Sequence, residues 1–398
     1  MTRELSGKRI LILGAGAWQA PYIQKAKKLG LRVFATDWED SAPGAPVADV
    51  FRRIDLRDKE RSLAFASESR VEAIFTSADI GVPTAAFVAG KLGLRYHSQE
   101  VALAATNKRV MRDKAKASGL SGPRYFPCRS LADALAGSRE IGFPLIMKPV
   151  DNCSSRGVSV VEDARHLKNY YRECERASFS GEIIIEELMQ GTEGSIEALV
   201  EDGKAVLLGV CDKQKSPLPY RYDLQLNYPG SYSNQQFVAI NEFAQRLVDG
   251  FEIKNGIIHV EIMITANSVR LIELAVRGCG SNVITHLIPA MTGFDVMEYL
   301  FLRAFGMRKD ITFTEDRPGL LRFIMLKPGK IKAITGVAAA WKTKGVLDLK
   351  IEREAGDIIA EVKDGRSRPG YMLLVANSKE QLEAIAKSVE ERLAVSYC

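Results

Sequence analysis

The chain has 398 residues, of which 46% are hydrophobic and 26% are charged, and its formal net charge is +6 at pH 7. This length predicts roughly two to four domains. The modest charge, spread along the chain, argues against a nucleic-acid-binding protein and favours a positive cleft for a small anion. No apolar run approaches the ~18 residues of a membrane helix, so we expect neither a nucleic-acid partner nor a membrane partner.

The cysteines and the N-terminus bear on location. The six cysteines show no metal-type spacing, which fits reduced thiols in a large chain. The first residues carry charges and lead directly into a strand-like run, whereas a signal peptide needs a longer apolar core and a cleavage site. We therefore expect a cytoplasmic protein.

Strands and helices alternate over the first part of the chain. The hydrophobic patterns predict strands at 9–13, 31–35 and 73–76 and helices at 18–29, 59–69 and 82–92. Such alternation favours a parallel sheet that is covered by helices.

A glycine-rich turn follows the first predicted strand. Gly14 and Gly16 lie in this turn, and Asp37 ends the second strand. Glycines there would admit a pyrophosphate, and an acid ~20 residues further on would bind a ribose hydroxyl. The pattern is incomplete because Gln19 occupies the third glycine position. A nicotinamide-dependent oxidoreductase is therefore the less favoured alternative.

The rest of the chain first continues the mixed pattern and then changes. Helices are predicted at 108–118, 131–136, 164–177, 236–251 and 295–305. Strands are predicted at 145–148, 157–161, 183–187, 193–200 and 205–212, with a polar loop at 213–236. From about residue 307, short strands at 320–326, 330–335 and 346–351 precede a helix at 378–394.

Two short apolar runs near 260–262 and 271–276 flank a turn-rich segment and predict an antiparallel hairpin. Each strand carries one carboxylate, Glu261 or Glu273. Two ionised glutamates that face each other in apolar surroundings would repel unless a cation lies between them. Magnesium favours carboxylate and phosphate oxygens, so the hairpin indicates a magnesium site in a nucleotide-dependent enzyme.

Lys148 ends an apolar strand and precedes a hydroxyl-rich turn that contains Ser154, Ser155, Arg156 and Gly157. The ammonium supplies charge, and the turn N–H groups and hydroxyls supply directed donors for a polyphosphate. The turn is not a Walker A loop, because GxxxxGK[ST] occurs nowhere in the chain. A polar hairpin turn without a ligand is the simple alternative.

A second apolar strand ends in Glu186 and Glu187, and Glu193 follows a few residues later. An acidic strand end beside an apolar linker can bind an adenine amino group and leave Glu193 for a ribose. An ordinary strand exit into solvent is the alternative.

Other polar residues have simpler interpretations. His259 and His286 have no cysteine or histidine partner at metal spacing, so each is better explained as a structural or substrate-contacting residue. Residues 220–223 are most simply a solvated loop, although such a loop could close on a substrate.

Taken together, these motifs resemble the ATP-grasp superfamily of carboxylate–amine ligases. Six short motifs occur in the order of that family: the helix opening with Lys108, the segment 119–123, Lys148, the 154–157 turn, the acidic segment 186–193, and the paired glutamates ending in Arg277. The resemblance covers nearly the whole chain.

The resemblance implies an ATP-grasp fold of mixed α/β and α+β class. An N-terminal parallel-sheet α/β domain would occupy 1–107, a linker helix and lid 108–190, a catalytic lobe 191–306, and a small β-rich α+β domain 307–398. Many members of the family are homodimers, and the resemblance leaves the assembly of this chain open.

The resemblance also assigns roles to residues. Lys108 and Lys148 would hold phosphates, and the 154–157 turn would cover them. Glu186, Glu187 and the Leu188 backbone would hold adenine, and Glu193 the ribose. Glu261 and Glu273 would bind Mg²⁺ or Mn²⁺, and Arg277, with Lys148, would act in catalysis by stabilising the acyl phosphate. The candidates for substrate contact are His259, Ser281, Asn282, His286 and the 213–230 loop.

One position departs from the usual family pattern. Many members carry an asparagine two residues after the second metal-binding glutamate, whereas this chain has Ala275. The form Glu-x-Ala-x-Arg-Gly-x-Gly is closer to the L-amino acid (dipeptide) ligase branch, which also has a small C-terminal β-rich domain.

The leading hypothesis is therefore an ATP- and magnesium-dependent ligase that joins a small carboxylate, of the amino acid class, to an amine. Its partners would be small-molecule substrates. The alternatives are a purine-biosynthesis or carbamoyl-phosphate type ligase of the same fold, the oxidoreductase described above, and, less favoured, a non-catalytic nucleotide-binding regulator.

Overall fold

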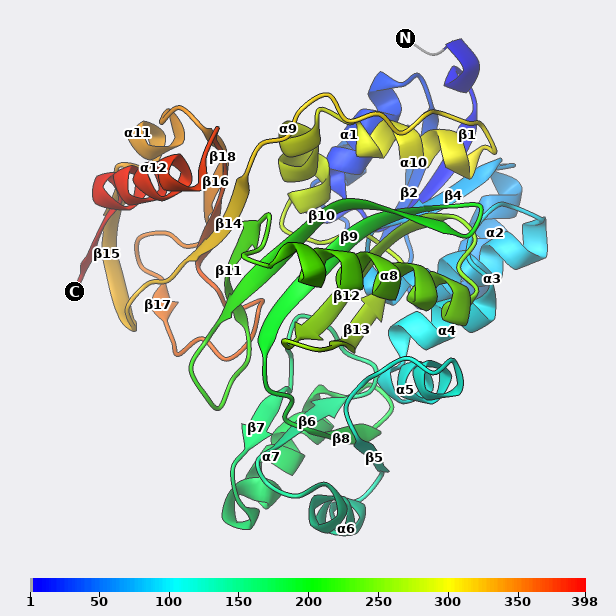
Figure 1. Ribbon diagram of the computed structural model, residues 1–398. Helices are drawn as coiled ribbons and strands as arrows, with labels where there is room; N and C mark the ends of the chain where they lie inside the picture. The colour runs from blue at the N-terminus through cyan, green and yellow to red at the C-terminus, as the bar shows by residue number, and fades with distance from the viewer. Residues whose placement is uncertain (1–2) are drawn as a thin grey trace.

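The N-terminal part of the molecule is a parallel sheet covered by helices (Figure 1). The computed structural model describes residues 3–398. The strand order is β3-β2-β1-β4, with β1 (Arg9–Leu13), β2 (Arg32–Asp37), β3 (Val50–Arg53) and β4 (Ala73–Thr76). The helices are α1 (Ala20–Lys28), α2 (Lys59–Glu68) and α3 (Val82–Leu92). The predicted parallel α/β arrangement is confirmed.

Two capped helices connect this sheet to the rest of the chain. They are α4 (Gln99–Thr106) and α5 (Lys108–Ala117). The Asn107 side chain accepts a hydrogen bond from Val110 N–H and thereby starts α5, as a side-chain cap should. Because α5 begins there, Lys108 is fixed at its first turn, and its N–H donates to Val150 O at 2.8 Å.

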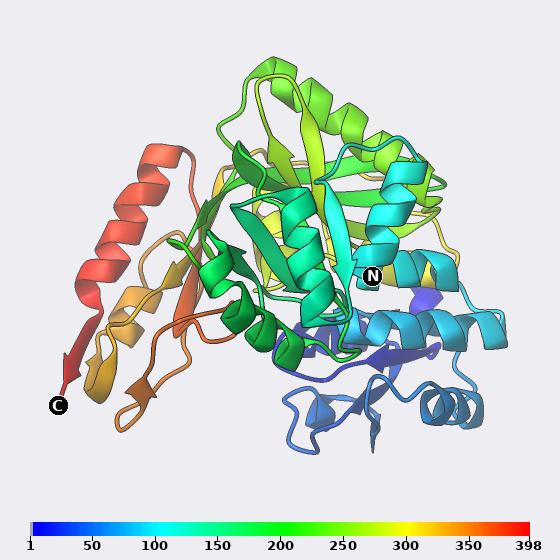
Figure 2. The same ribbon diagram turned by 90° about the horizontal axis from the view of Figure 1, so that it is seen from below.

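A four-stranded antiparallel sheet forms the lid, with the order β5-β8-β6-β7. Its strands are β5 (Tyr125–Cys128), β6 (Leu145–Pro149), β7 (Ser159–Val161) and β8 (Ile183–Glu187). Helices α6 (Leu131–Ile141) and α7 (Ala164–Ala177) cover its outer face and lie in front of it when the molecule is seen from below (Figure 2). The inner face of the lid sheet is turned toward the large sheet.

The large sheet has eight strands in the order β13-β12-β9-β10-β11-β14-β18-β16. Its first strands are β9 (Thr192–Glu201), β10 (Lys204–Lys215), β11 (Asp223–Tyr228), β12 (Gly256–Ile264) and β13 (Val269–Ala275). The last are β14 (Gly319–Ile324), β16 (Val346–Ile351) and β18 (Gly370–Val375). The sheet therefore continues across residue 307, where one predicted domain range ends and the next begins.

Helix α8 (Asn234–Phe251) packs with α4 and α5 on one face of the large sheet. On the other face lie η4 (Val283–Leu287), α9 (Ile288–Thr292) and α10 (Val296–Ala304). These helices share a core with the N-terminal sheet, in which Ile10, Leu208 and Tyr299 are buried together. One continuous core of this kind holds the N-terminal sheet against the large sheet.

The C-terminal region adds a small sheet and two helices (Figure 1). The sheet has the order β17-β15-β19, with β15 (Gly329–Thr335), β17 (Ile358–Ile359) and β19 (Ala394–Tyr397). The helices are α11 (Val337–Trp341) and α12 (Lys379–Arg392). Short 3-10 turns occur at η1 (Arg3–Leu5), η2 (Ala45–Val47) and η3 (Asp79–Gly81). Over residues 3–398, no helix is long and apolar enough to cross a membrane.

The prediction of a polar loop over 213–236 is partly wrong. Residues 216–222 and 229–233 are loops, but strand β10 extends to Lys215, β11 occupies Asp223–Tyr228, and α8 begins at Asn234. Polar and apolar residues alternate over 223–228, as they do in a strand with one apolar face, but this short run lies among turn-forming residues.

Candidate active site

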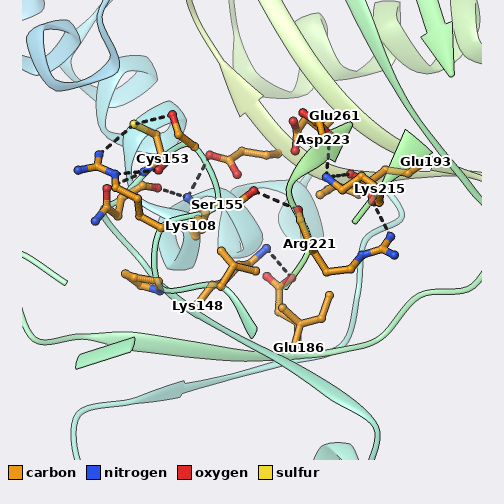
Figure 3. A pocket seen from close by; sticks show the side chains of 18 of the residues that line it. Lys108, Lys148, Cys153, Ser155, Glu186, Glu193, Lys215, Arg221, Asp223 and Glu261 are labelled. Atoms are coloured by element: carbon orange, nitrogen blue, oxygen red, sulfur yellow. Dashed lines mark hydrogen bonds and ion pairs between the residues drawn. The ribbon is translucent and has the colours of Figure 1, made fainter. Parts of the chain in front are cut away.

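A cleft opens between the inner face of the lid and the large sheet (Figure 3). Its walls come from lid strands β6 and β8, the loop 152–158, and strands of the large sheet. The predicted site residues that line it are Lys108, Lys148, Ser154, Ser155, Arg156, Glu186, Glu187, Leu188, Glu193, His259, Glu261, Glu273 and Arg277. Folding thus brings together side chains that are far apart in the sequence.

The carboxylate hairpin forms as predicted. Strands β12 and β13 pair antiparallel, and Glu261 lies directly opposite Glu273. The hairpin turn is closed by a hydrogen bond of 2.9 Å from Thr265 N–H to Ser268 O. Both carboxylates face the same cleft, as cross-strand partners on one face of a sheet do.

Each of these carboxylates has a lysine partner. Glu273 lies 3.0 Å from Lys108 Nζ, and Glu261 bonds Lys213, whose side chain is only 1% exposed. Burial would raise the pKa of Glu261, but Lys213, His259 and Lys215 together outweigh burial and hold that pKa well below the ordinary value. Burial lowers the pKa of Lys108, but Glu273 outweighs burial, and the pKa of Lys108 is raised above its ordinary value.

The two glutamates suit a divalent cation. They offer hard oxygen donors from adjacent strands to one cleft, and the pKa of Glu261 keeps it ionised at neutral pH. Ala275, on the same strand as Glu273, lines the cleft without a side-chain oxygen. Mg²⁺ usually completes its coordination with water and phosphate, so two carboxylates are a sufficient protein contribution.

Glu186 is the centre of a buried charge cluster. Its carboxylate is 2% exposed and accepts hydrogen bonds of 2.8 and 3.2 Å from the Arg112 guanidinium. The Lys148 ammonium lies 2.7 Å away. Burial raises the pKa of Glu186, but Arg112 and Lys148 lower it to about 2. Burial in turn lowers the pKa of Lys148 from its ordinary value.

The hydroxyl-rich turn is a strained loop at the mouth of the cleft. Ser154 and Ser155 have φ of 59° and 56°, and Gly157 has φ of 71°. A Cβ on Gly157 would lie 2.6 Å from the Ala177 side chain, so glycine is required there. Gly157 itself does not line the cleft, whereas Arg156 does, with its Nε donating to Cys153 O at 3.1 Å.

The remaining predicted nucleotide residues are also at the cleft. Glu187 bonds Arg270 and lies 2.9 Å from Arg124, while Leu188 follows it at the end of β8. Glu193 is buried between Lys215 at 2.8 Å and Arg221 at 2.9 Å. Their assigned adenine and ribose contacts stay predictions.

Arg277 is fixed from the N-terminal sheet. Asp79, in η3, accepts hydrogen bonds of 2.9 Å from Arg277 Nε and 2.7 Å from Nη2. Arg277 Nη1 donates to Gly278 O at 2.8 Å. Burial alone would raise the pKa of Asp79, but the ion pair with Arg277 outweighs burial, and the pKa of Asp79 is lowered. A fork held in this way has a defined orientation toward the cleft.

His259 is held by a fully buried carboxylate. Its Nδ1 bonds Glu197, and its Nε2 lies 3.7 Å from Glu261. Glu197 also accepts a hydrogen bond of 3.0 Å from Cys279 N–H. Burial lowers the pKa of His259, but Glu197 more than compensates and raises it to about 9.

Three other candidate substrate residues lie outside the lining of the cleft: Ser281, Asn282 and His286. Asn282 donates to Asp348 at 2.8 Å, and the His286 Nδ1 lies 2.7 Å from the Thr285 hydroxyl. Ser281 and Asn282 both have positive φ, 52° and 58°. Their substrate roles stay predictions.

Several residues in and around the cleft were not individually assigned by sequence reasoning, which named only the 213–230 segment as a whole. Lys215 of β10 and Asp223 of β11 line the cleft, and the Asp223 carboxylate lies 2.8 Å from Lys215 and 3.6 Å from the buried Lys213. Arg112 bonds Glu186, and Asp79 bonds Arg277, so each of them contacts a lining residue of the cleft. The alternation of lysines was the available signal, but the segment was assigned to a loop.

Two parts of the chain match known protein domains. Residues 141–286 match the ATP-grasp domain, and residues 322–397 match the L-amino acid ligase C-terminal domain 2. The chain therefore contains an ATP-grasp domain, as its ordered motifs predict. Alanine–anticapsin ligase from Bacillus subtilis is 27% identical over 276 residues, which cover 63% of this chain and 58% of that protein.

Two further relatives match this chain over different shares of their own length. An uncharacterized protein from Sinorhizobium fredii is 24% identical over 72% of this chain and 60% of its own length. The chain therefore spans about 60% of each of these first two relatives. A formate-dependent phosphoribosylglycinamide formyltransferase from Rhodococcus jostii is 25% identical over 77% of both chains.

Solved structures show the same ATP-grasp fold. The L-amino acid ligase from Bacillus licheniformis superposes with a TM-score of 0.83 at 21% identity and covers 99% of both chains. The N5-carboxyaminoimidazole ribonucleotide synthetase from Thermotoga maritima has a TM-score of 0.76 at 18% identity, over 98% of this chain and 100% of that one. The predicted fold class is thereby confirmed.

Proposed function

We propose that this ATP-grasp chain activates a small carboxylate as an acyl phosphate and joins it to an amine, with release of ADP and phosphate. The observation that carries the proposal is the facing pair Glu261 and Glu273 in one cleft with Lys148 and Arg277. Two carboxylates for a metal and two cations for phosphoryl oxygens are what this chemistry requires.

The reaction follows from elementary chemistry. A carboxylate is a poor electrophile, and transfer of the γ-phosphoryl group gives an acyl phosphate that an amine can attack at neutral pH. Such transfer depends on positioning and charge neutralisation. Lys108 and Lys148 would orient the phosphates, and Arg277, fixed by Asp79, would neutralise charge on the reacting acyl phosphate. Mg²⁺, held by Glu261 and Glu273, would supply further charge neutralisation when bound.

The geometry also limits how the nucleotide would be held. The carboxylate of Glu186 is occupied by Arg112 and Lys148, so we assign its side chain to positioning Lys148. Leu188 and the backbone at the end of β8 are then the better candidates for the adenine edge.

We infer an amino acid as the carboxylate substrate. Ala275 and the match of 322–397 to an L-amino acid ligase C-terminal domain support this branch. The test measures ADP release from purified protein with pairs of amino acids, with an aminoribosyl phosphate and formate, and with bicarbonate. ADP release that depends on two amino acids is expected. Release only with the sugar phosphate would instead favour the purine-biosynthesis alternative.

The oxidoreductase alternative needs an acid that is free to bind a ribose hydroxyl, and Asp37 is not free. Asp37 is buried and accepts a hydrogen bond of 2.8 Å from Ala15 N–H, so its carboxylate closes the turn after β1. Quenching of NADH fluorescence on titration would reverse this inference.

The same proposal includes the cellular location, the metal ion and the assembly of the chain. We expect a cytoplasmic enzyme, in keeping with six free cysteines, that uses Mg²⁺ or Mn²⁺. A homodimer and the domain ranges 1–107, 108–190, 191–306 and 307–398 also stand as proposals. Sedimentation of the purified chain would test the assembly.

A further inference from the structure

The segment 216–222, between β10 and β11, is an ordered wall of the cleft. The Ser216 hydroxyl donates to Tyr220 O at 2.7 Å, and Ser216 N–H donates to Tyr222 O at 2.8 Å. Tyr222 is buried, and Arg221 lines the cleft. The prediction of a solvated loop over 220–223 is therefore only partly right: residues 220–222 form a loop, but Tyr222 is buried and the Ser216 hydroxyl pairs with backbone groups of Tyr220 and Tyr222.

This wall is bonded to the phosphate-binding turn of the lid. The Ser155 hydroxyl donates to Arg221 O at 3.1 Å, and Val160 N–H of β7 donates to Pro219 O at 2.9 Å. Arg221 also bonds Glu193 at 2.9 Å (Figure 3). The wall thus connects the lid with the floor of the cleft.

A loop of the C-terminal region supports both the wall and the lid. Gly365 N–H donates to Ser154 O at 3.0 Å, and the Lys363 ammonium lies 5.5 Å from the centre of the Tyr220 ring. The loop itself is compact, because the Asp364 carboxylate accepts from Arg366 and Ser367 N–H, both at 2.9 Å. Segments about 140 to 210 residues apart therefore meet at the mouth of the cleft.

Arg368 links these contacts. Its Nε donates to Gly365 O at 2.8 Å, and its Nη1 donates to Asp223 O at 2.9 Å. Its guanidinium lies 3.2 Å from the centre of the Phe323 ring, a stacking that restrains the planar group. No contact joins Arg368 to the predicted ATP or metal ligands themselves, so its effect on the cleft must be indirect.

We propose that Arg368 is a positioning residue for the nucleotide cleft. By fixing the loop 363–368 and the start of β11, it holds the wall 216–222 and the lid turn 153–157 closed around a bound nucleotide. The C-terminal region then forms part of the nucleotide site, in addition to any role in substrate choice. The proposal rests on the nucleotide cleft of the proposed function.

The test compares Arg368→Met with Arg317→Met in the full chain. Arg317 also donates to a backbone carbonyl, Ala290 O at 2.7 Å, but away from the cleft. In Arg368→Met, the Kd for MgADP and the KM for ATP should rise about tenfold, the value of one charge-assisted hydrogen bond. The kcat at saturating ATP should change less than about twofold, and amide exchange at 153–157 should accelerate. Arg317→Met should leave all four unchanged.

A milder variant guards against misfolding. Gly365→Ala would place a Cβ 3.1 Å from Ser154 O and should produce the same changes to a smaller degree. Unchanged Kd and unchanged exchange in both variants would overturn the proposal. Failure of the wild type to bind MgADP would overturn the proposed function instead, while exchange at 153–157 without nucleotide would still test the role of Arg368.

Discussion

Three cations of the cleft are each paired with an acid. Lys108 pairs with Glu273, Lys148 with Glu186, and Arg277 with Asp79. Buried charges persist only when they are compensated in this way. The same pairs hold the cations where phosphates would arrive, so the cleft is preorganised before the nucleotide binds.

Glu273→Gln tests the metal assignment. The variant removes one of two carboxylates from the metal site, so amine-dependent ADP release should fall on the order of 100-fold and the Mg²⁺ concentration needed for half-maximal rate should rise. Glu60→Gln, at an exposed position of α2, should behave as wild type. Unaltered ADP release in Glu273→Gln would end the assignment of Glu273 as a metal ligand.

Variants of the buried cluster should destabilise the fold in a defined order. Glu186→Gln leaves Arg112 and Lys148 without their shared partner, whereas Arg112→Met leaves one matched pair. Loss of a buried charge partner costs about 3–5 kcal/mol, so urea unfolding should show the larger loss for Glu186→Gln. An equal or reversed order would contradict the shared-partner geometry.

The same cluster predicts a pH dependence. The folded-state pKa of Glu186 is lowered from 4.5 to about 2, so its contribution is present above 4.5 and is lost as the pH falls toward 2. The urea midpoint of the wild type should fall across this window, and that of Glu186→Gln should fall less. Parallel profiles for the two proteins would argue against a lowered pKa.

At the scale of elements, apolar periodicity was a good guide. Helix α7 (Ala164–Ala177) and strand β8 (Ile183–Glu187) form at the predicted residues, because α7 has the apolar spacing of a helix and β8 is a short run of β-branched isoleucines. Strand β11 was missed, although polar and apolar residues alternate over 223–228, because this short run lies among turn-forming residues. Strand β18 was missed because all six of its residues are buried, and such a run shows no alternation.

The lid turn gives a prediction at this scale. Gly157 and Gly181 both have positive φ, 71° and 76°, but only Gly157 has neighbours within 4 Å of an added Cβ. Gly181→Ala should cost ~1 kcal/mol of stability, from backbone strain alone. Gly157→Ala should cost more and should raise the KM for ATP about tenfold by displacing the turn. Equal effects of both substitutions on the KM would contradict a role of this turn in binding ATP.

At the scale of the molecule, the cleft is assembled from every part of the chain. The N-terminal sheet supplies Asp79, the lid supplies Lys148 and Glu186, the large sheet supplies the glutamates, and the C-terminal loop supports the wall (Figure 1). Displacement of any one of these parts should therefore change the rate of the catalysed reaction.

Asp79→Asn tests this dependence. The substitution keeps the shape but removes the charge that fixes Arg277, so kcat should fall between about 10- and 100-fold while MgADP affinity stays near that of the wild type. Asp40→Asn, at an exposed ion pair of the same domain, is the control. A wild-type kcat in Asp79→Asn would show that Arg277 is positioned without the N-terminal sheet.

The amino-acid sequence by itself determined the alternating elements, the hairpin with its facing glutamates, and the order of motifs that indicates an ATP-grasp ligase. These features depend on local periodicity and on residues close together in the chain. Only the tertiary structure decided that Arg112 and Lys148 share Glu186, that Asp79 fixes Arg277, and that Arg368 supports the wall of the cleft. Such pairings join residues tens to hundreds of positions apart, and a charged side chain carries no local signal of the partner that compensates its burial.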